Sequence, residues 1–214
     1  MVLAALINAC RVSGKVFKEL KIVVNGAGAA GIAITRLLFA QGAGEIILVD
    51  SKGIIHTGRT DLNATKKKIA RTTNRKKIKG SLAAAMIEAD VFIGVSQPDL
   101  VSKEMVRSMN PEPIIFAMAN PKPEILPEEA IAGGAAIVGT GRSDYPNQVN
   151  NALVFPGIFR GLLDGRIRRV TTRMKIAAAL AVAYSIKPKK DRILPSVLDK
   201  KVVKAIAKAI IKNR

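Results

Sequence analysis

The stretch Lys-Ile-Val-Val-Asn-Gly-Ala-Gly-Ala-Ala-Gly at residues 21–31 decides the fold of this chain. The apolar residues 22–24 are typical of a buried parallel strand, and the glycines after them have the Gly-x-Gly-x-x-Gly spacing that leads such a strand into a helix. Gly26 permits a tight turn, Gly28 allows backbone to approach a pyrophosphate, and Gly31 allows the helix to pack close to the strand. The stretch therefore predicts a dinucleotide site.

An acidic residue supports this prediction. A second apolar strand is predicted at residues 46–49, and it ends in Asp50, nineteen residues beyond Gly31. A carboxylate at about this separation binds the ribose hydroxyls of a dinucleotide. Glycine spacing alone is a weak signal, because many glycine turns after strands bind nothing, so a purely structural turn remains the alternative.

Further cofactor contacts follow from the same geometry. The first turn of the helix after the glycines offers free N–H groups to phosphates, which adds Ala29 and Ala30 to the predicted contacts. Asp50 favours the free ribose diol of NAD, whereas Ser51 and Lys52 favour the 2′-phosphate of NADP through a hydrogen bond and a charge. The predicted cofactor is therefore NAD or NADP, with tolerance of NADP slightly favoured.

Apolar runs alternate with helical segments as far as residue 139. Such alternation predicts an α/β fold with a doubly wound, Rossmann-like parallel sheet and right-handed crossovers. The predicted strands are residues 22–24, 46–49, 91–95, 114–118 and 135–139. The predicted helices of this part are residues 2–12, 32–41, 61–71, 82–88, 102–109 and 127–132.

The chain after Pro146 is predicted to be a C-terminal helical extension. In its last segment Val203, Ile206 and Ile210 fall on one helix face, which favours packing on the domain over membrane binding. The predicted helices here are residues 147–165, 171–185 and 199–211. The chain thus divides into a leading helix, a Rossmann-like core and the helical extension, at residues 1–20, 21–145 and 146–214.

The charge balance is strongly basic. Lys and Arg number 35 against 16 Asp and Glu, which gives a net charge of +19, and the cations gather at residues 66–79 and 187–214. Such a charge favours acidic partners, but solvated faces are preferred over a nucleic-acid site because aromatic residues make up only 4% and Trp is absent. We expect neither a specific nucleic acid nor a membrane as a partner.

The cysteine content indicates the compartment. One cysteine, Cys10, excludes an intramolecular disulfide and fits a reducing, cytoplasmic environment. The apolar residues 2–9 do not resemble a secretion signal, because no Lys or Arg precedes them and the run is too short to span a bilayer. A helix apolar on most sides at this end is expected to leave an exposed apolar flank, and hence to seek a copy of the chain or a complementary N-terminal chain.

The carboxyl ends of the strands are the expected ligand site, because ligands of doubly wound sheets bind in the crevice there. This rule places Val95 and Ser96 among the predicted cofactor contacts. It gathers at one rim the glycine turn and residues 50–52, 95–98, 120–123 and 140–143.

Five motifs occur in order along the chain. They are Val-Val-Asn-Gly-Ala-Gly-Ala-Ala-Gly at 23–31, Ile-Leu-Val-Asp-Ser-Lys-Gly at 47–53, Ala-Asn-Pro-x-Pro-Glu at 119–124, Gly-Arg-Ser-Asp-Tyr-Pro-Asn-Gln-Val-Asn-Asn at 141–151, and Phe-Pro-Gly-Ile-Phe-Arg-Gly at 155–161. The first motif is generic, but together the five resemble the malic enzyme family, the NAD(P)-dependent oxidative decarboxylases of malate, in its shorter prokaryotic form. The similarity runs from Val2 to the C-terminus.

The resemblance implies roles for three asparagines. Asn120 contacts nicotinamide and substrate in the family, and Asn150 and Asn151 match the family's substrate-binding pair. The residues alone favour helix capping or turn formation for the last two. Arg142 and Asp144 are further candidates, although an internal ion pair explains them equally well.

The implied reaction needs groups that this stretch does not match. Oxidation of malate needs a base for the hydroxyl proton, and loss of CO2 on the way to pyruvate needs a divalent ion for the enolate. In the family a lysine, a tyrosine and three acids that hold Mg or Mn all precede the position of Met1, so no catalytic residue and no metal ligand are predicted in this chain. His56 is a bystander, and Tyr145 and Tyr184 do not match the catalytic tyrosine.

Overall fold

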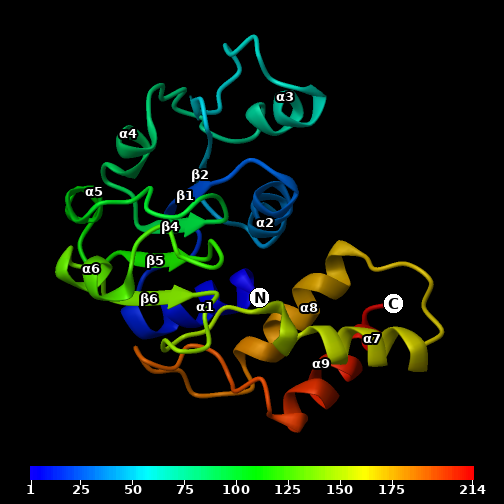
Figure 1. Ribbon diagram of the computed structural model, residues 1–214. Coiled ribbons are helices and arrows are strands. Elements are labelled where there is room, and N and C mark those ends of the chain that lie inside the picture. Colours follow the sequence, from blue (N-terminus) through cyan, green and yellow to red (C-terminus); the bar gives the residue numbers. More distant parts are fainter.

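A six-stranded sheet in the order β3-β2-β1-β4-β5-β6 forms the centre of the computed structural model, which describes residues 1–214 (Figure 1). Five strands run parallel, and only the edge strand β3 is antiparallel to its neighbour β2. The strands are β1 (Lys21–Asn25), β2 (Glu45–Asp50), β3 (Gly53–Ile54), β4 (Val91–Gly94), β5 (Ile114–Ala117) and β6 (Ile137–Thr140). The doubly wound α/β fold is confirmed.

The interiors of the parallel strands are apolar because helices cover both faces of the sheet. Ile22 and Val24 of β1 face the larger hydrophobic cluster, whereas Val23 between them faces the smaller one. Helices α1 (Val2–Ser13), α2 (Ala29–Ala40) and α8 (Thr172–Ala183) contribute to the larger cluster. Helices α4 (Leu82–Met86), α5 (Lys103–Arg107) and α6 (Pro127–Ala132) contribute to the smaller cluster. Helix α3 (Ala64–Ala70) contributes Ile69 and Ala70 to the larger cluster.

The direction of winding reverses at β1. Strand β1 pairs with β2 on one side and with β4 on the other, in each case in parallel register. The carboxyl ends of β1 and β4 therefore border the topological switch point, where ligands bind in such sheets.

Helix α1 is covered within this chain, so the expected exposed apolar flank is wrong. Leu3 and Leu6 are buried, and no apolar residue of the helix is exposed. The buried Asn8 donates from Nδ2 to the carbonyl oxygens of Ala183 at 2.9 Å and Ile193 at 2.8 Å. These bonds tie α1 to the end of α8 and to the segment after it.

The predicted helix over 147–165 is wrong in its first half. A 3-10 turn at Asn151–Leu153 is followed by helix α7 (Phe155–Asp164). Asn147 has φ +57°, and its side chain bonds to Val138 O, Lys190 O and Ile193 N, so this segment is anchored by loop contacts. Pro156 fits the first turn of α7, where its missing N–H costs nothing.

Other differences are local. The chain after Asp50 was expected to be a loop but forms β3, and the helix expected over 61–71 begins only at Ala64, where Asn63 caps it. In helix α9 (Lys200–Lys212), Val202 is buried and Val203 only half-buried, although Ile206 and Ile210 are buried as expected. No helix is long and apolar enough to cross a membrane.

Two glycines allow α7 to lie close on α9, as Figure 1 shows at the C-terminal end. A Cβ on Gly157 would come within 2.6 Å of Ile206 Cβ, and one on Gly161 within 2.7 Å of Ile210 Cβ. Both glycines are buried.

We expect Gly157→Ala to lower the free energy of unfolding. Alanine favours a helix by about 1 kcal/mol over glycine, but overpacking of a buried contact costs about 1–3 kcal/mol, and the contact here is with side chain and backbone together. Denaturant titration measures the change. Gly28→Ala is the control, since nothing lies within 4 Å of its Cβ, and equal stability of both variants would contradict the close approach.

Candidate functional site

The glycine turn joins β1 to α2 and is held by backbone contacts. Gly26 has φ +112°, and a Cβ there would lie 2.6 Å from the carbonyl oxygen of Val95. A Cβ on Gly31 would overlap the carbonyl oxygen of Gly26. These two glycines are therefore required by the fold of the turn itself.

Gly28 differs from both of them. It is exposed, it has an extended backbone with φ −84° and ψ −167°, and a Cβ placed on it would have no atom within 4 Å. Any residue adopts such a backbone. The packing of the turn therefore does not require the absence of a side chain at Gly28.

The helix start beside this turn offers N–H groups. The first backbone bond across the start of α2 runs from Ile32 N to Gly28 O at 3.1 Å. The amides of Ala29, Ala30 and Gly31 therefore precede the helical ladder and lack an intrahelical acceptor. Ala29 and Ala30 are exposed, so this helix end is open to an anion.

Asp50 ends β2 and is held by two cations. Its Oδ1 accepts from Arg59 Nη1 at 2.8 Å, and its Oδ2 accepts from Lys66 Nζ at 2.5 Å. Burial raises the pKa of Asp50, but the hydrogen bonds from Arg59, Lys66 and the Lys52 amide together lower it by more. The pKa of Asp50 therefore lies below its usual value. The side chain is only 9% exposed, so a ribose would have to share the carboxylate with these cations.

Lys52 reaches a different carboxylate. Its Nζ lies 3.3 Å from Asp61 Oδ2, and Arg59 Nη2 lies 2.7 Å from the same oxygen. Lys52 and Ser51 are both exposed. Three cations and two acids therefore lie together around Asp50. Their net positive charge favours an anionic group.

Glu124 connects the loop after β4 with the loop after β5. Its fully buried carboxylate accepts from Ser96 N and from Ala119 N, both at 3.0 Å. Burial raises the pKa of Glu124 above its usual value despite these bonds. Gly94 leaves room for the carboxylate, because a Cβ there would overlap it. This contact fixes the loops that carry Ser96 and Asn120.

A cavity of about 770 Å³ lies along α2, between that helix, the start of α1, the loops after the strands and the start of α8. It brings together five predicted site residues, namely Ala30, Val95, Asn120, Asn150 and Asn151. Its wall also contains residues that were not predicted, among them Met118, Gly141, Thr172 and Lys175. The other predicted residues lie outside this wall, namely Gly26, Gly28, Ala29, Gly31, Asp50, Ser51, Lys52 and Ser96.

The asparagines differ in their contacts. Asn120 is exposed at the end of β5, where it precedes Pro121 across a cis peptide bond. Asn150 Oδ1 accepts from Ala152 N at 3.0 Å, which is the capping contact that the residues alone favour. Asn151 is exposed at the start of the 3-10 turn.

The other candidates make internal contacts. Arg142 forms an ion pair with Asp144, with Nη2 2.5 Å from Oδ2. His56 Nδ1 accepts from Gly58 N at 3.1 Å, and the ring of Tyr145 lies 5.3 Å from the Arg142 guanidinium. No group of three or more His, Cys, Asp and Glu side chains in residues 1–214 is arranged to hold a metal ion.

Several residues of the site were missed, and the signals for four of them differ. Glu124 stands in the quoted motif at 119–124, so its place after a strand was a usable signal. Lys175 is one of two cations in the first turn of the otherwise apolar helix α8, which is a weaker signal. No sequence signal pointed to Arg59 and Lys66, because their contacts with Asp50 depend on the path of the chain around β3.

The whole chain matches one known family. The family model described as "Malic enzyme, NAD binding domain" matches residues 1–214.

Relatives carry the same likeness. The bifunctional malic/malolactic enzyme of Bacillus subtilis is 52% identical over 98% of this chain, and the NADP-dependent malic enzyme of Rhizobium meliloti is 54% identical over 84%. The crystal structure of the NAD-dependent malic enzyme from Thermotoga maritima superposes on 100% of the chain with a TM-score of 0.96 and 43% identity. The chain spans about half the length of the Bacillus relative (52%), 24% of the Rhizobium relative and 57% of the Thermotoga chain.

Proposed function

Because this chain belongs to the malic enzyme family, as its NAD-binding domain, we propose that it binds NAD or NADP for the oxidative decarboxylation of malate to pyruvate and CO2. The observation that supports this function is the gathering of Ala30, Val95, Asn120, Asn150 and Asn151 on one cavity beside the glycine turn. These residues come from four separate parts of the chain, and only the fold brings them together.

The roles of the residues follow from their positions. Gly26, Gly28 and Gly31 shape the turn, and the amides of Ala29 and Ala30 bind the pyrophosphate. Asp50, Ser51 and Lys52 bind the adenosine ribose, and Val95 and Ser96 line the path between the two halves of the cofactor.

Substrate would lie at the other end of the cavity. Asn120 orients the nicotinamide and donates to a malate carboxylate, and Asn150 and Asn151 bind the same substrate. NAD or NADP, when bound, would supply the hydride acceptor for the oxidation of malate. No group of three or more His, Cys, Asp and Glu side chains in the 214 residues could hold a metal ion, and the resemblance implies that the Mg or Mn ligands belong to a part of the family that this chain does not match.

We propose that the chain consists of a leading helix (1–20), a Rossmann-like core (21–145) and a helical extension (146–214). Malate and pyruvate are its small-molecule partners, and a copy of the chain or a complementary N-terminal segment is its protein partner. The buried, unpaired Cys10 suits a cytoplasmic location.

Cofactor binding is the direct test of this function. NADH and NADPH are titrated into the chain and followed by isothermal calorimetry. One-to-one saturable binding of either cofactor supports the proposal, and failure of both to bind would refute it. The Asn120→Ala variant should keep adenosine binding, measured with ADP-ribose, and lose affinity for the complete dinucleotide.

We expect NADP to bind within about 100-fold of NAD, because Lys52 is free to reach a 2′-phosphate. Its side chain is 69% exposed, and its only ion pair is with the partly exposed Asp61. The Lys52→Gln variant should lose affinity for NADP and not for NAD, as competition titrations would show. Lys79→Gln removes an equal charge elsewhere and serves as the control. A preference for NAD above about 100-fold, worth about 2.7 kcal/mol, would contradict the role of Lys52.

A further inference from the structure

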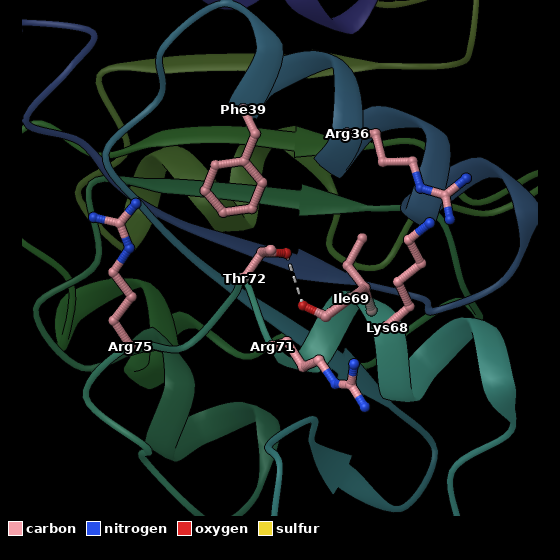
Figure 2. A pocket seen from close by; sticks show the side chains of 7 residues that line it. All are labelled: Arg36, Phe39, Lys68, Ile69, Arg71, Thr72 and Arg75. Atoms are coloured by element: carbon pink, nitrogen blue, oxygen red, sulfur yellow. Dashed lines mark hydrogen bonds between the residues drawn. The ribbon is translucent and has the colours of Figure 1, made fainter.

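A second cavity, of about 560 Å³, lies between α2 and α3. Four cations line it, namely Arg36, Lys68, Arg71 and Arg75, and together with the apolar Phe39 and Ile69 they form what we call the basic pocket. Figure 2 shows the head groups of Arg36 and Lys68 toward one end and that of Arg75 toward the other, with the Phe39 ring between them.

The cations of the basic pocket have no counter-charge. None of the four side chains takes part in any of the eleven ion pairs of the chain, whose cations all lie elsewhere. No acid lines the cavity, and the carboxylate of Glu45 accepts from the backbone N of Arg75 at 2.9 Å without reaching its guanidinium. Four like charges around one hollow attract and concentrate anions.

The chemistry of the lining narrows the class of anion. Guanidinium groups present paired N–H donors that match phosphate oxygens, and three of the four cations are arginines. Thr72 donates its hydroxyl to Ile69 O at 3.0 Å, which leaves the Oγ1 lone pairs as the only side-chain acceptor in the lining (Figure 2). Almost all polar side-chain groups of the lining are therefore hydrogen-bond donors. The positive charge of the lining favours a ligand with several negative charges.

The basic pocket is separate from the glycine turn, where the cofactor is proposed to bind. Phe39 lies ten residues after Ala29 on α2, which is about 15 Å along the helix axis. None of the residues of the glycine turn lines the basic pocket. Arg36 lines this pocket and also the cavity of the candidate site, so the two are neighbours that share one side chain.

We propose that the basic pocket binds a small polyphosphate anion, with phosphate oxygens on Arg36, Lys68 and Arg75 and any ring of the ligand packed on Phe39. The site goes beyond the proposed function, because it uses neither the glycine turn nor the asparagines and shares only Arg36 with the other cavity. A small ligand fits better than a nucleic acid, since the cations surround a hollow and the chain has few aromatic residues on which bases could stack.

The test is a calorimetric titration of inorganic tripolyphosphate at about 0.15 M salt, where weak surface attraction is largely screened. The variant Arg36→Ala/Lys68→Ala/Arg75→Ala removes three pocket cations. The matched control Lys67→Ala/Lys76→Ala/Lys79→Ala removes three cations of the same basic region that do not line the cavity. Thermal unfolding of both variants shows whether they are folded, and the single reversal Lys68→Glu replaces the triple pocket variant if that variant does not fold. The Gly28→Val variant reports any binding at the glycine turn.

We expect one-to-one binding that survives in Gly28→Val and in the control, and that falls at least tenfold in the pocket variant or in Lys68→Glu. Guanosine triphosphate, titrated in parallel, should bind more tightly than tripolyphosphate, and Phe39→Ala should cancel that gain if the ring packs there. Four results would overturn the proposal: no saturable binding, equal weakening in pocket and control variants, loss of binding in Gly28→Val, or a duplex nucleic acid that binds more tightly than either probe.

Discussion

Gly28→Val should remove binding of NAD and NADP while leaving the chain folded. Gly28 is exposed, its backbone suits any residue, and no atom lies within 4 Å of the position of a Cβ, so valine fits the free chain without a clash. In the complex the same side chain would occupy the space of the pyrophosphate beside the N–H groups of Ala29 and Ala30. Calorimetry should show a loss of at least about 100-fold in affinity, equivalent to about 2.7 kcal/mol.

Gly31→Val is the informative comparison for this result. Its Cβ would overlap the carbonyl oxygen of Gly26, so this variant should lose thermal stability as well as binding. The two variants therefore separate a glycine needed by the ligand from a glycine needed by the turn. Unchanged cofactor affinity in Gly28→Val would mean that the pyrophosphate does not approach this turn, and the site assignment would fail.

The sequence could predict the sheet because the interior of each parallel strand is an apolar run, and these runs alternate with helical segments. The glycine pattern at Gly26–Gly31 added the position of the switch point, since it follows the strand that starts the second winding direction. From these two features the rim residues Val95 and Asn120 followed without knowledge of any contact. Both line one cavity in the structure.

The remaining differences have tertiary causes. The segment at 147–150 was predicted to begin a helix, but Asn147 gains three hydrogen bonds outside a helix, and no local pattern reveals partners as distant as Lys190 and Ile193. Strand β3 has two residues and pairs only with β2, so it is too short for any periodicity.

Contacts between charged side chains were the least predictable part of the site. Asp50 was assigned to ribose by its distance along the chain from Gly31, and that spacing cannot show that Arg59 and Lys66 already hold the carboxylate. Those cations come from the segment after β3, whose course was not predicted. At the proposed site, any preference between NAD and NADP would therefore depend on all the charges of this cluster and not on Asp50 alone.

The 214 residues on their own should bind cofactor and yet not turn over malate. The resemblance to the malic enzyme family places the lysine and tyrosine of proton transfer and the acids of the metal site outside the part that this chain matches. Loss of general acid–base catalysis costs about 100- to 10,000-fold, and loss of a metal removes several kcal/mol of transition-state stabilisation. Reduction of NAD(P) with malate and Mn should therefore stay at background for this polypeptide.

Complementation distinguishes an incomplete site from a site assigned to the wrong residues. The N-terminal half of a longer relative, such as the Bacillus subtilis enzyme of which this chain spans 52%, is added to the assay with malate, Mn and cofactor. If the asparagines and the glycine turn form one half of the active site, turnover should rise on addition, and Gly28→Val and Asn120→Ala should each suppress the rise. Turnover by residues 1–214 alone, abolished by Asn120→Ala, would contradict this view, because the proton-transfer groups would then have to lie among the residues to which we assign only binding.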